Sequence, residues 1–504
     1  MPQKEVVRGG PVHSPRTRAA MMNRRDALKG LGLAAAAAAL PRRSEAAKAP
    51  GRPPNLVVIF IDDMGYGDIE PFGSTLNHTP HLSRMAEEGM KLTSFYVAAP
   101  VCTPSRAALM TGCYPRRVGL DRGSIHAVLF PGDRHGLHPN EITVAEVLKG
   151  AGYATGCFGK WHLGDQPQFL PTSQGFDTYF GIPYSNDMWP EHGRWRFPPL
   201  PLVRGKEVVG QVETMDDQAL LCKQVTDEAV RFIRDHRDRP FFCYVPHAFV
   251  HHPRGAREAF LEKAKNPDKV TGAQIEEVDW SVGQILGTLR DLDLAENTLV
   301  LFTSDNGGAG GCVNKPLRGG KGSTWEGGMR EPTVAWWPGR VPAGAVCDEV
   351  ATAMDVLPTF AALAGQKPPT DRIIDGHDIR PLLFAEPGAE SPWNAFFYYD
   401  AGRRLRAVRA GQWKLFADGR LYDLDADIGE TTDVAKQHPD VVARLKIHLD
   451  RCRADLGEGE NLGPNCRPVG VDPHSKTLLP RPWAEGPAAH APVGNQDIKK
   501  RKKR

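Results

Sequence analysis

Four oxygen-bearing side chains stand directly after apolar runs of this 504-residue chain: Asp62, Asp63, Asp305 and Asn306. The runs are residues 55–61 and 298–303. Carboxylate and amide oxygens suit Ca²⁺ best and Mg²⁺ second. Either pair alone also fits a solvated acidic turn, but adjacent carboxylates at a buried sheet edge repel each other unless a cation lies between them. The two pairs together therefore predict a divalent metal site.

A second chemical signal is the stretch Cys102-Thr103-Pro104-Ser105-Arg106, which continues into the apolar segment 107–110. Pro104 suits the first turn of a helix, so the side chain of residue 102 should lie at the electropositive helix end, where an anion binds well. Pro104 also removes a backbone N–H that could stabilise a thiolate, which makes an unmodified thiol a poor nucleophile here. The alternative is a small buried cysteine beside a helix cap.

Basic and proton-transferring side chains accompany these groups: Lys160, His162, Lys321 and Arg106. Lys321 lies in the glycine-dense segment 318–328, which allows close backbone approach to an anion. Arg106 follows Cys102 by one helical turn and offers a planar fork of donors. Each could instead be a solvated surface charge.

The elements that must position these groups follow from four apolar runs that end in polar residues: 55–61 before Asp62, 153–158 before Lys160, 240–245 before His247, and 298–303 before Asp305. Such runs are typical of a central, mostly parallel sheet. Ligands bind at the carboxyl edge of open sheets of this kind, so the four ends should meet. A capping box at Thr143 and apolar stripes over 275–289 and 353–363 predict helices between the strands.

The predicted fold class is α/β, with a large, mostly parallel mixed sheet flanked by helices. Short antiparallel strands over 405–409, 413–416 and 420–424, and a helix over 439–455, predict a smaller C-terminal α+β subdomain. We therefore divide the chain into four parts: an export signal (1–49), a catalytic domain (50–390), this antiparallel-sheet subdomain (391–456) and a Gly/Pro-rich basic tail (457–504). The tail is expected either to follow the surface or to lack order.

Charge is concentrated at the two ends. Residues 1–49 hold ten Lys or Arg against three Asp or Glu and the last six residues are all basic, whereas the whole chain carries only +3, so its body is acidic. This balance argues against a nucleic-acid partner. Arg24-Arg25, the apolar run 31–40 and the small-residue site 47–49 resemble a twin-arginine export signal. We expect a soluble protein of the bacterial periplasm or secreted medium, with no membrane span.

Nine cysteines are present, and eight remain when Cys102 is set aside. An even number is compatible with disulfides in an oxidising compartment. No paired CxxC spacing occurs, so a thiolate zinc site is not predicted.

Taken together, these stretches resemble the arylsulfatase family of the alkaline-phosphatase-like superfamily, over about residues 55–433. The likeness rests on the Cys102 segment and on loops similar to those of the arylsulfatase A and N-acetylgalactosamine-6-sulfatase branch: residues 181–185, 320–324 and 326–332. The resemblance implies an alkaline-phosphatase-like fold and a sulfuric ester hydrolase. It also implies that a formylglycine-generating enzyme converts Cys102 into formylglycine. The hydrated aldehyde has two hydroxyls, one to attack sulfur and one to expel sulfate later.

The same resemblance implies roles for individual residues. Asp62, Asp63, Asp305, Asn306 and the modified Cys102 would hold Ca²⁺, with Mg²⁺ as second choice. Arg106 and His162 would stabilise the hydrate, Lys160 and Lys321 would bind sulfate, and Ser185 would contact substrate. The proton donor to the leaving group is assigned to His251, counted from Phe241-Phe242, with His247 and His252 as competitors.

An aromatic and basic cluster after Ser185 narrows the class of substrate. Its residues are Trp189, His192, Arg194, Trp195 and Arg196. It suits stacking on sugars, so a sulfated carbohydrate is favoured over an aryl sulfate, although a packed loop with Arg on Trp fits equally well. Two other functions stay open: a phosphoesterase or phosphonate-ester hydrolase on the same fold, and a non-catalytic binder of sulfated glycans. The sequence indicates no oligomeric state.

Overall fold

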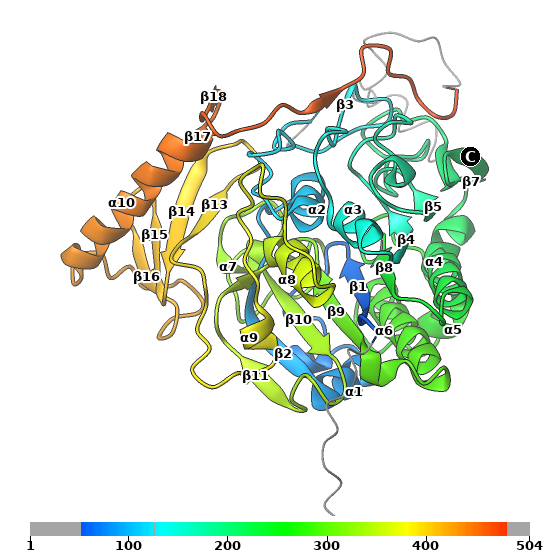
Figure 1. The fold of residues 1–504 in the computed structure, drawn as a ribbon, viewed down its shortest axis with the longest axis horizontal. Helices are drawn as coiled ribbons and strands as arrows, with labels where there is room; N and C mark the ends of the chain where they lie inside the picture. Colours follow the sequence, from blue (N-terminus) through cyan, green and yellow to red (C-terminus); the bar gives the residue numbers. More distant parts are fainter. Residues whose placement is uncertain (1–51, 124–126, 481–504) are drawn as a thin grey trace, which may run out of the picture. The chain divides into compact units, whose positions relative to one another are not determined.

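The computed structural model describes residues 52–123 and 127–480, and a mixed sheet of eleven strands lies at their centre (Figure 1). The predicted export signal and the last residues of the basic tail lie outside the described residues and stay predictions. In spatial order the strands are β11 (Ala345–Cys347), β2 (Met90–Tyr96), β10 (Arg330–Trp336), β9 (Thr298–Ser304), β1 (Asn55–Ile61), β8 (Phe241–Pro246), β4 (Ala154–Lys160), β5 (Thr178–Ile182), β6 (Leu200–Arg204) and β7 (Glu207–Val212), with β12 (Ala351–Thr352) beside β2.

The middle of the sheet is parallel from β9 through β1, β8 and β4 to β5. Its first four strands are those predicted from the apolar runs, each within two residues of its predicted bounds. Ile61 pairs with Ser304 and Phe60 with Pro246, so the carboxyl ends of β9, β1 and β8 lie level. The polar residues that follow these strands therefore meet at one edge, as the sequence predicts.

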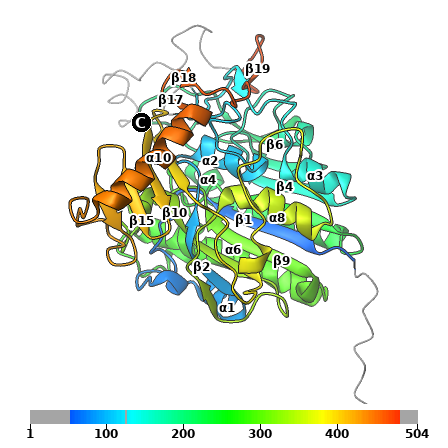
Figure 2. The ribbon, with the colours of Figure 1, turned by 60° about the vertical axis from the view of Figure 1, so that its left-hand side comes forward.

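Helices cover both faces of the sheet (Figure 2). Along β1, Leu56, Val58 and Phe60 belong to one apolar core, and the alternating residues Val57, Ile59 and Ile61 belong to another. The first core includes residues of α2 (Cys102–Thr111), α3 (Val144–Gly150) and α8 (Val356–Leu363), and the second includes residues of α1 (Pro80–Glu88), α4 (Met215–Asp235) and α6 (Lys269–Asp291). Successive residues of a strand point to opposite faces of the sheet, and here both faces pack against helices. Every position of the strand is therefore apolar, which explains the unbroken apolar runs.

The predicted helices are found. Thr143 opens α3 with a capping box in which its hydroxyl accepts from the Glu146 amide at 3.1 Å. The predicted helix 353–363 divides into a 3₁₀ turn, Ala353–Asp355, and α8. Three further helices are single turns: α5 (Glu258–Leu261), α7 (Glu326–Met329) and α9 (Arg380–Leu383). No helix within residues 52–123 and 127–480 is both long and apolar enough to cross a membrane.

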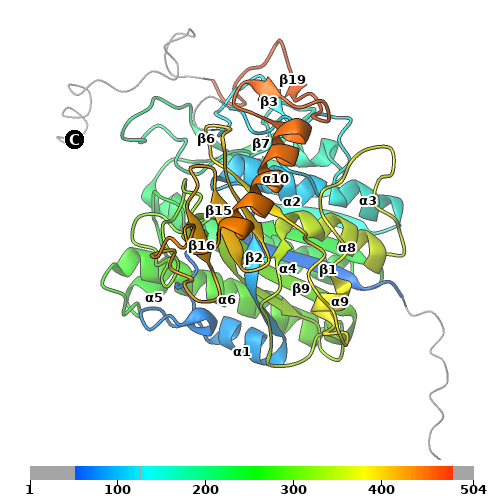
Figure 3. The ribbon, with the colours of Figure 1, turned by 90° about the vertical axis from the view of Figure 1, so that its left-hand side faces the viewer.

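A four-stranded antiparallel sheet follows, in the order β13 (Phe396–Tyr399), β14 (Leu405–Ala410), β15 (Trp413–Phe416) and β16 (Leu421–Asp423). Helix α10 (Pro439–Leu456) packs on it (Figure 3). Beyond α10, β17 (Gly457–Glu458) pairs with β18 (Asn461–Leu462), and β19 (Gly470–Val471) pairs with β3 (His135–Gly136). Residues 457–480 therefore follow the surface of the body, which was one of the two predicted outcomes.

The nine cysteines, all within the described residues, are unpaired thiols, so the disulfides that their number permits are absent. Most are core residues of separate layers: Cys157 on β4 belongs to one apolar core and Cys243 on the neighbouring β8 to the other. An even count does not bring two thiols within bonding distance.

A buried ion cluster joins the small sheet to the segment that carries Lys321. Lys414 of β15 lies 2.9 Å from a carboxylate oxygen of Glu326 in α7 and 2.8 Å from one of Glu430. All three side chains are fully buried. Tyr398 of β13 also donates to Glu326, at 2.9 Å. Burial raises the pKa of Glu326, but Lys414 and then Arg330 outweigh it and hold that pKa at about 2.

Removing the cation of this cluster should destabilise the fold strongly. In Lys414→Met, two buried carboxyl groups lose their shared partner, and we expect the free energy of unfolding to fall by about 3–5 kcal/mol. Urea unfolding measures this change. Lys223→Met, which breaks an exposed ion pair with Asp227 on α4, is the matched control and should cost less than ~1 kcal/mol. Equal losses in the two variants would contradict the analysis.

Candidate active site

The acidic residues predicted to bind metal lie together at the carboxyl edge of the sheet. Asp62 and Asp63 follow β1, Asp305 and Asn306 follow β9, and all four are fully buried. Each carboxylate has its own cation from a different element, and the pairs are Asp62 with Lys160 at 2.5 Å, Asp305 with Arg106 at 2.7 Å and Asp63 with Lys321 at 2.7 Å. The structure thus brings the predicted ligands and the predicted cations into one cluster.

Three buried oxygens of this cluster have no hydrogen-bond partner among the described residues: Asp62 Oδ1, Asp63 Oδ2 and Asn306 Oδ1. Asn306 instead donates through Nδ2 to Asp63 Oδ1 at 2.8 Å, which leaves its own oxygen available. Orphaned buried oxygens are costly unless a cation or water satisfies them. A set made of carboxylate and amide oxygens fits a hard divalent ion, so these residues fit Ca²⁺ or Mg²⁺.

The pKa shifts of the carboxyl groups follow from burial and crowding. Burial, and then the charge of Asp62, raises the pKa of Asp305 to about 7. Burial also opposes ionisation of Asp62, but Lys160 and His251 outweigh it and hold its pKa well below the usual range. Neighbouring carboxyl groups with pKa values shifted in opposite directions are typical of functional sites.

Two residues of the cluster have left-handed backbones without being glycine. Asp63 and His162, which both follow strands, have φ of 62°. Such conformations cost about 1 kcal/mol or more and persist where surrounding contacts impose them. At Asp63, the amide donates to Asp305 Oδ1 at 3.2 Å, so the turn that strains the backbone also joins the two acidic segments.

Cys102 is the first residue of α2 and is 2% exposed. Burial raises the pKa of its thiol, despite the nearby Lys160 and Lys321, so the unmodified side chain is a protonated thiol and a weak nucleophile. The thiol lines a cavity of about 380 Å³ together with Lys321 and His251. The helix start therefore directs residue 102 into a pocket that can hold an anion.

Arg106 and His162 are buried and do not line this cavity. Arg106 is fully buried and donates both to Asp305 and, at 3.0 Å, to the carbonyl of Lys160. His162 lies 3.0 Å from the carbonyl of Leu129 through Nε2, and burial places its pKa well below the usual value. Ser185, which lines the cavity, accepts from Lys160 Nζ at 3.1 Å. Lys160 thereby links the acidic cluster to the cavity wall.

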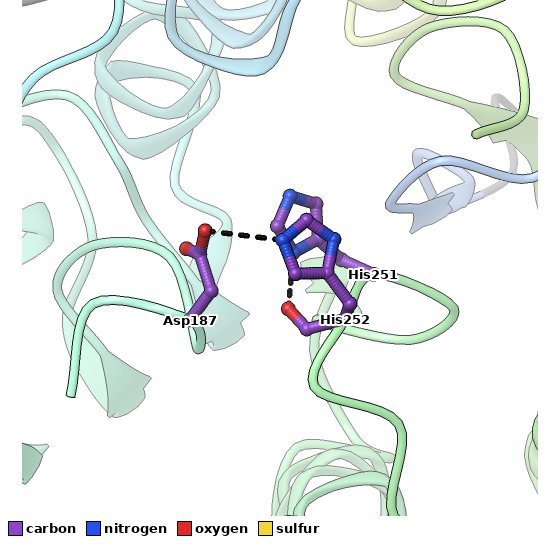
Figure 4. Close-up of side chains that lie close together, drawn as sticks. All are labelled: Asp187, His251 and His252. Atoms are coloured by element: carbon purple, nitrogen blue, oxygen red, sulfur yellow. Dashed lines mark hydrogen bonds and ion pairs between the residues drawn. The ribbon is translucent and has the colours of Figure 1, made fainter. Parts of the chain in front are cut away.

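The structure separates the three competing histidines. His251 lines the cavity, with Nε2 3.7 Å from Asp63 Oδ2. His252 also lines the cavity, but its side chain is 62% exposed. Its Nε2 lies 3.5 Å from the Asp187 carboxylate (Figure 4). His247 is fully buried against Ser281 of α6, 3.1 Å from its hydroxyl, and burial lowers its pKa to about 4. His247 is thus a core residue, and His251 is the histidine nearest the acidic cluster.

Three of the five residues of the predicted aromatic and basic cluster form one wall of the cavity, the outer wall. His192, Arg194 and Trp195 line it, and the Arg194 guanidinium lies 4.9 Å from the centre of the Trp195 ring. The predicted Arg-on-Trp packing is therefore found, and it forms part of the cavity wall, whereas stacking on a sugar stays a prediction. Trp189 is buried and lines an adjoining pocket of about 690 Å³. The two pockets share residues and form one extended cleft.

Sequence reasoning missed Asp187 and Glu331. Asp187 lies between the two pockets, and its position two residues after Ser185 was the one available signal. Glu331 is a fully buried acid on β10 whose carboxyl oxygens have no hydrogen-bond partner among the described residues. Burial, then the charges of Asp305 and Asp63, raises its pKa well above the usual value. Nothing in the local sequence distinguishes it from a surface glutamate.

Comparison with known proteins decides the family. Residues 54–366 match the family model described as Sulfatase, and residues 320–455 match the model of the C-terminal part of N-sulphoglucosamine sulphohydrolase. The chain belongs to the sulfatase family. Its curated relatives are sulfuric ester hydrolases, and so is this sulfatase.

Human arylsulfatase A is 38% identical to this sulfatase over 481 residues, which cover 84% of this chain and 92% of that protein. The N-acetylgalactosamine-6-sulfatase of Canis lupus familiaris is 42% identical over 480 residues, covering 86% and 88%. Among solved structures, Ps i-CgsB in complex with k-i-k-neocarrahexaose has a TM-score of 0.72 and 30% identity, covering 79% of this chain and 92% of that one. The phosphonate monoester hydrolase of Agrobacterium radiobacter, with 20% identity, 80% and 95% coverage and a TM-score of 0.58, shares the alkaline-phosphatase-like fold alone.

Proposed function

We propose that this sulfatase removes sulfate from a sulfated carbohydrate, with formylglycine at position 102 and a divalent cation, preferably Ca²⁺. The observation that carries the proposal is the composition of one cavity. Cys102, Lys321 and His251 form its inner part, beside the orphaned carboxylate oxygens, and an aromatic and basic wall forms its outer part. The inner part suits a sulfate group and the outer part suits a sugar.

Asp62, Asp63, Asp305, Asn306 and the modified Cys102 would hold the cation, which would polarise the sulfate oxygens as a Lewis acid. Conversion of Cys102 to formylglycine, by a formylglycine-generating enzyme, would supply an oxygen nucleophile in place of a buried protonated thiol. Arg106 lies one turn along α2 from residue 102, where its fixed charge can hold such an oxygen in place. His162 follows β4, and its imidazole, whose Nδ1 has no hydrogen-bond partner among the described residues, can accept a proton.

Lys160, Lys321 and Ser185 would bind the sulfate. Their charges and dipoles are already held by the acidic cluster, so little reorganisation is needed when charge develops on the sulfate oxygens. This preorganisation follows from the contacts of Lys160 with both Asp62 and Ser185.

His251 would donate the proton to the departing sugar oxygen. Burial, and then Lys321, lowers its pKa far below the usual value without substrate. A bound sulfate brings negative charge next to the ring and raises that pKa, because an opposite charge favours the protonated imidazole. Protonation of His251 is thus coupled to substrate binding.

The extended cleft supports a carbohydrate over a small aryl ester. A substrate that filled only the inner cavity would leave the adjoining pocket beside Trp189 unused. The relative Ps i-CgsB was solved with a neocarrahexaose, an oligosaccharide, and it shares 30% of its residues with this chain. A phosphoesterase or phosphonate-ester hydrolase has less support, because the phosphonate hydrolase shares the fold at only 20% identity.

Residue 102 should be required for turnover. We expect Cys102→Ala to lower kcat for p-nitrophenyl sulfate at least about a thousandfold, because the nucleophile is removed. Cys113→Ala, at a buried cysteine outside the cavity, is the matched control and should retain activity.

Wild-type protein should hydrolyse p-nitrophenyl sulfate far faster than p-nitrophenyl phosphate. Mass spectrometry of the peptide containing residue 102 should show formylglycine, and an intact thiol in fully active protein would overturn the proposal.

The proton donor can be tested through the leaving group. His251→Asn should lower kcat for a sugar sulfate about 10²–10⁴-fold, because a sugar alkoxide needs a proton to depart. The loss for p-nitrophenyl sulfate should be much smaller, since p-nitrophenolate is a stable leaving group. His247→Asn is the control and should show no difference between the two substrates. Equal losses of His251→Asn on both would assign His251 to another role.

The outer wall can be tested separately from the chemistry. Trp195→Ala should raise KM for a sulfated oligosaccharide about tenfold, through loss of roughly 1.4 kcal/mol of stacking. Its kcat/KM for p-nitrophenyl sulfate should stay close to wild type. Trp413→Ala, at a half-buried tryptophan of the small sheet, is the matched control. Unchanged kinetics on sulfated oligosaccharides would remove the support for a carbohydrate substrate.

A further inference from the structure

The charge of the cleft differs between its two pockets. Lys321 lines the inner cavity but not the adjoining pocket. The adjoining pocket of about 690 Å³ is lined by three carboxylates, those of Asp187, Glu191 and Glu213, against one guanidinium, that of Arg194. A sulfate therefore suits the inner cavity, whereas a group without negative charge suits the adjoining pocket.

Of these three carboxylates, that of Asp187 alone lines both pockets. Its side chain is 17% exposed and lies beside the ring of His252 (Figure 4). Charges that are mostly buried are screened less by water and salt than exposed ones, so Asp187 repels a nearby anion more strongly than an acid on the surface does. Its position is therefore the one at which a second anionic group beside the bound sulfate would be most unfavourable.

The two histidines of the adjoining pocket do not cancel its negative charge. His192 Nδ1 accepts from the backbone amides of Arg194 at 3.0 Å and Trp195 at 2.9 Å, which requires a lone pair on that nitrogen and hence a neutral ring. Burial also lowers the pKa of His192. His252 can carry at most one positive charge, so the three carboxylates still exceed the cations that line the pocket.

The start of helix α4 also lines this pocket, through Thr214 and Met215. A helix N-terminus can bind an anion through its free amides. Here Asp217 occupies that position, because its carboxylate accepts from the amides of Glu213 at 3.0 Å and Thr214 at 2.9 Å. The protein's own carboxylate thus takes the place that a sulfate or carboxylate of a ligand would need.

Asp187 is held in place by buried amide groups. Asn186 Nδ2 donates toward the carbonyl oxygens of His251 and Pro253, each at 3.4 Å, and Gln218 of α4 donates to the carbonyl of Asn186 at 2.9 Å. Asn186 and Gln218 are both buried. The segments on the two sides of the cleft are therefore connected to α4 before any ligand binds, so the Asp187 carboxylate is preorganised.

We propose that Asp187 determines specificity by restricting the substrate to sulfated sugars whose neighbouring sugar unit carries neither sulfate nor carboxylate. This inference deepens the proposed function and rests on it. A carboxylate accepts hydrogen bonds from the hydroxyls of an uncharged sugar. A second sulfate or a uronic acid at this place offers no donor to Asp187 and adds a like charge, which is how a site selects against a competing ligand.

Competition with p-nitrophenyl sulfate at pH 8 measures this preference. The probes are two pairs of disaccharides, one pair built on galactose 4-sulfate and the other on galactose 6-sulfate. Within each pair the second sugar is glucose or glucuronic acid, so the two members differ by one carboxylate. We expect the neutral member to have an inhibition constant at least about tenfold lower in wild type, because like charges side by side oppose binding.

Variants locate the preference at Asp187. Asp187→Asn should lower the ratio of the two inhibition constants at least about threefold, whereas Asp187→Glu, which keeps the charge, should preserve it. Asp227→Asn, at an exposed acid of α4 outside both pockets, is the matched control and should also preserve it. A general disturbance of the site would change both constants alike and leave their ratio unchanged. Glu213→Gln, at an exposed acid of the same pocket, should lower the ratio in the same direction even if Asp187→Asn does not fold.

Equal inhibition by the neutral and the anionic member of each pair would overturn the proposal and leave the proposed function standing. An unchanged ratio in folded Asp187→Asn would do the same. If none of the four disaccharides inhibits a protein that hydrolyses p-nitrophenyl sulfate, the carbohydrate substrate fails together with the role of Asp187.

Discussion

The structure depends on balancing three carboxylates that are buried at one edge of a sheet. Asp62, Asp63 and Asp305 have no exposure to water, and each is matched by one cation from a different part of the chain. Removing any of these cations would leave a buried charge without compensation, a loss of several kcal/mol. Three cations still leave oxygens of Asp62 and Asp63 without partners, and this residual demand for positive charge supports the proposed metal site over a set of structural ion pairs.

Different elements of the fold position those three cations beside the carboxylates. Lys160 arrives at the end of β4, parallel to β1 with β8 between them, and Arg106 arrives from the first turns of α2. Lys321 is held less directly, because its loop contributes no strand to the large sheet. Five residues after it, Glu326 is fixed by Lys414 of the small sheet. The C-terminal sheet therefore takes part in the charge balance of the site without contributing a residue to the cavity.

The sequence predicts the central strands well because they are buried on both faces and read as unbroken apolar runs. It predicts that Asp62, Lys160 and Asp305 meet because parallel strands share a carboxyl edge. It does not predict Asp187, whose place beside His252 depends on how two loops fold over that edge. It permits disulfides that are absent, because the number of cysteines carries no information about their separation. Among three nearby histidines it assigns the proton donor to His251 only through the family resemblance, because the burial and the ring direction that distinguish them are set by the fold.

The protonation of the buried His251 ring depends on the same charges that compensate the buried carboxylates. Burial, and then the charge of Lys321, lowers the pKa of the imidazole, so in the free site its Nε2 bears a lone pair. Negative charge arriving with a sulfate would change that balance and favour a proton on the ring. The electrostatic compensation that keeps the acids buried therefore also determines whether His251 holds a proton. In the proposed reaction the substrate itself, through its sulfate, brings the charge that prepares the proton donor.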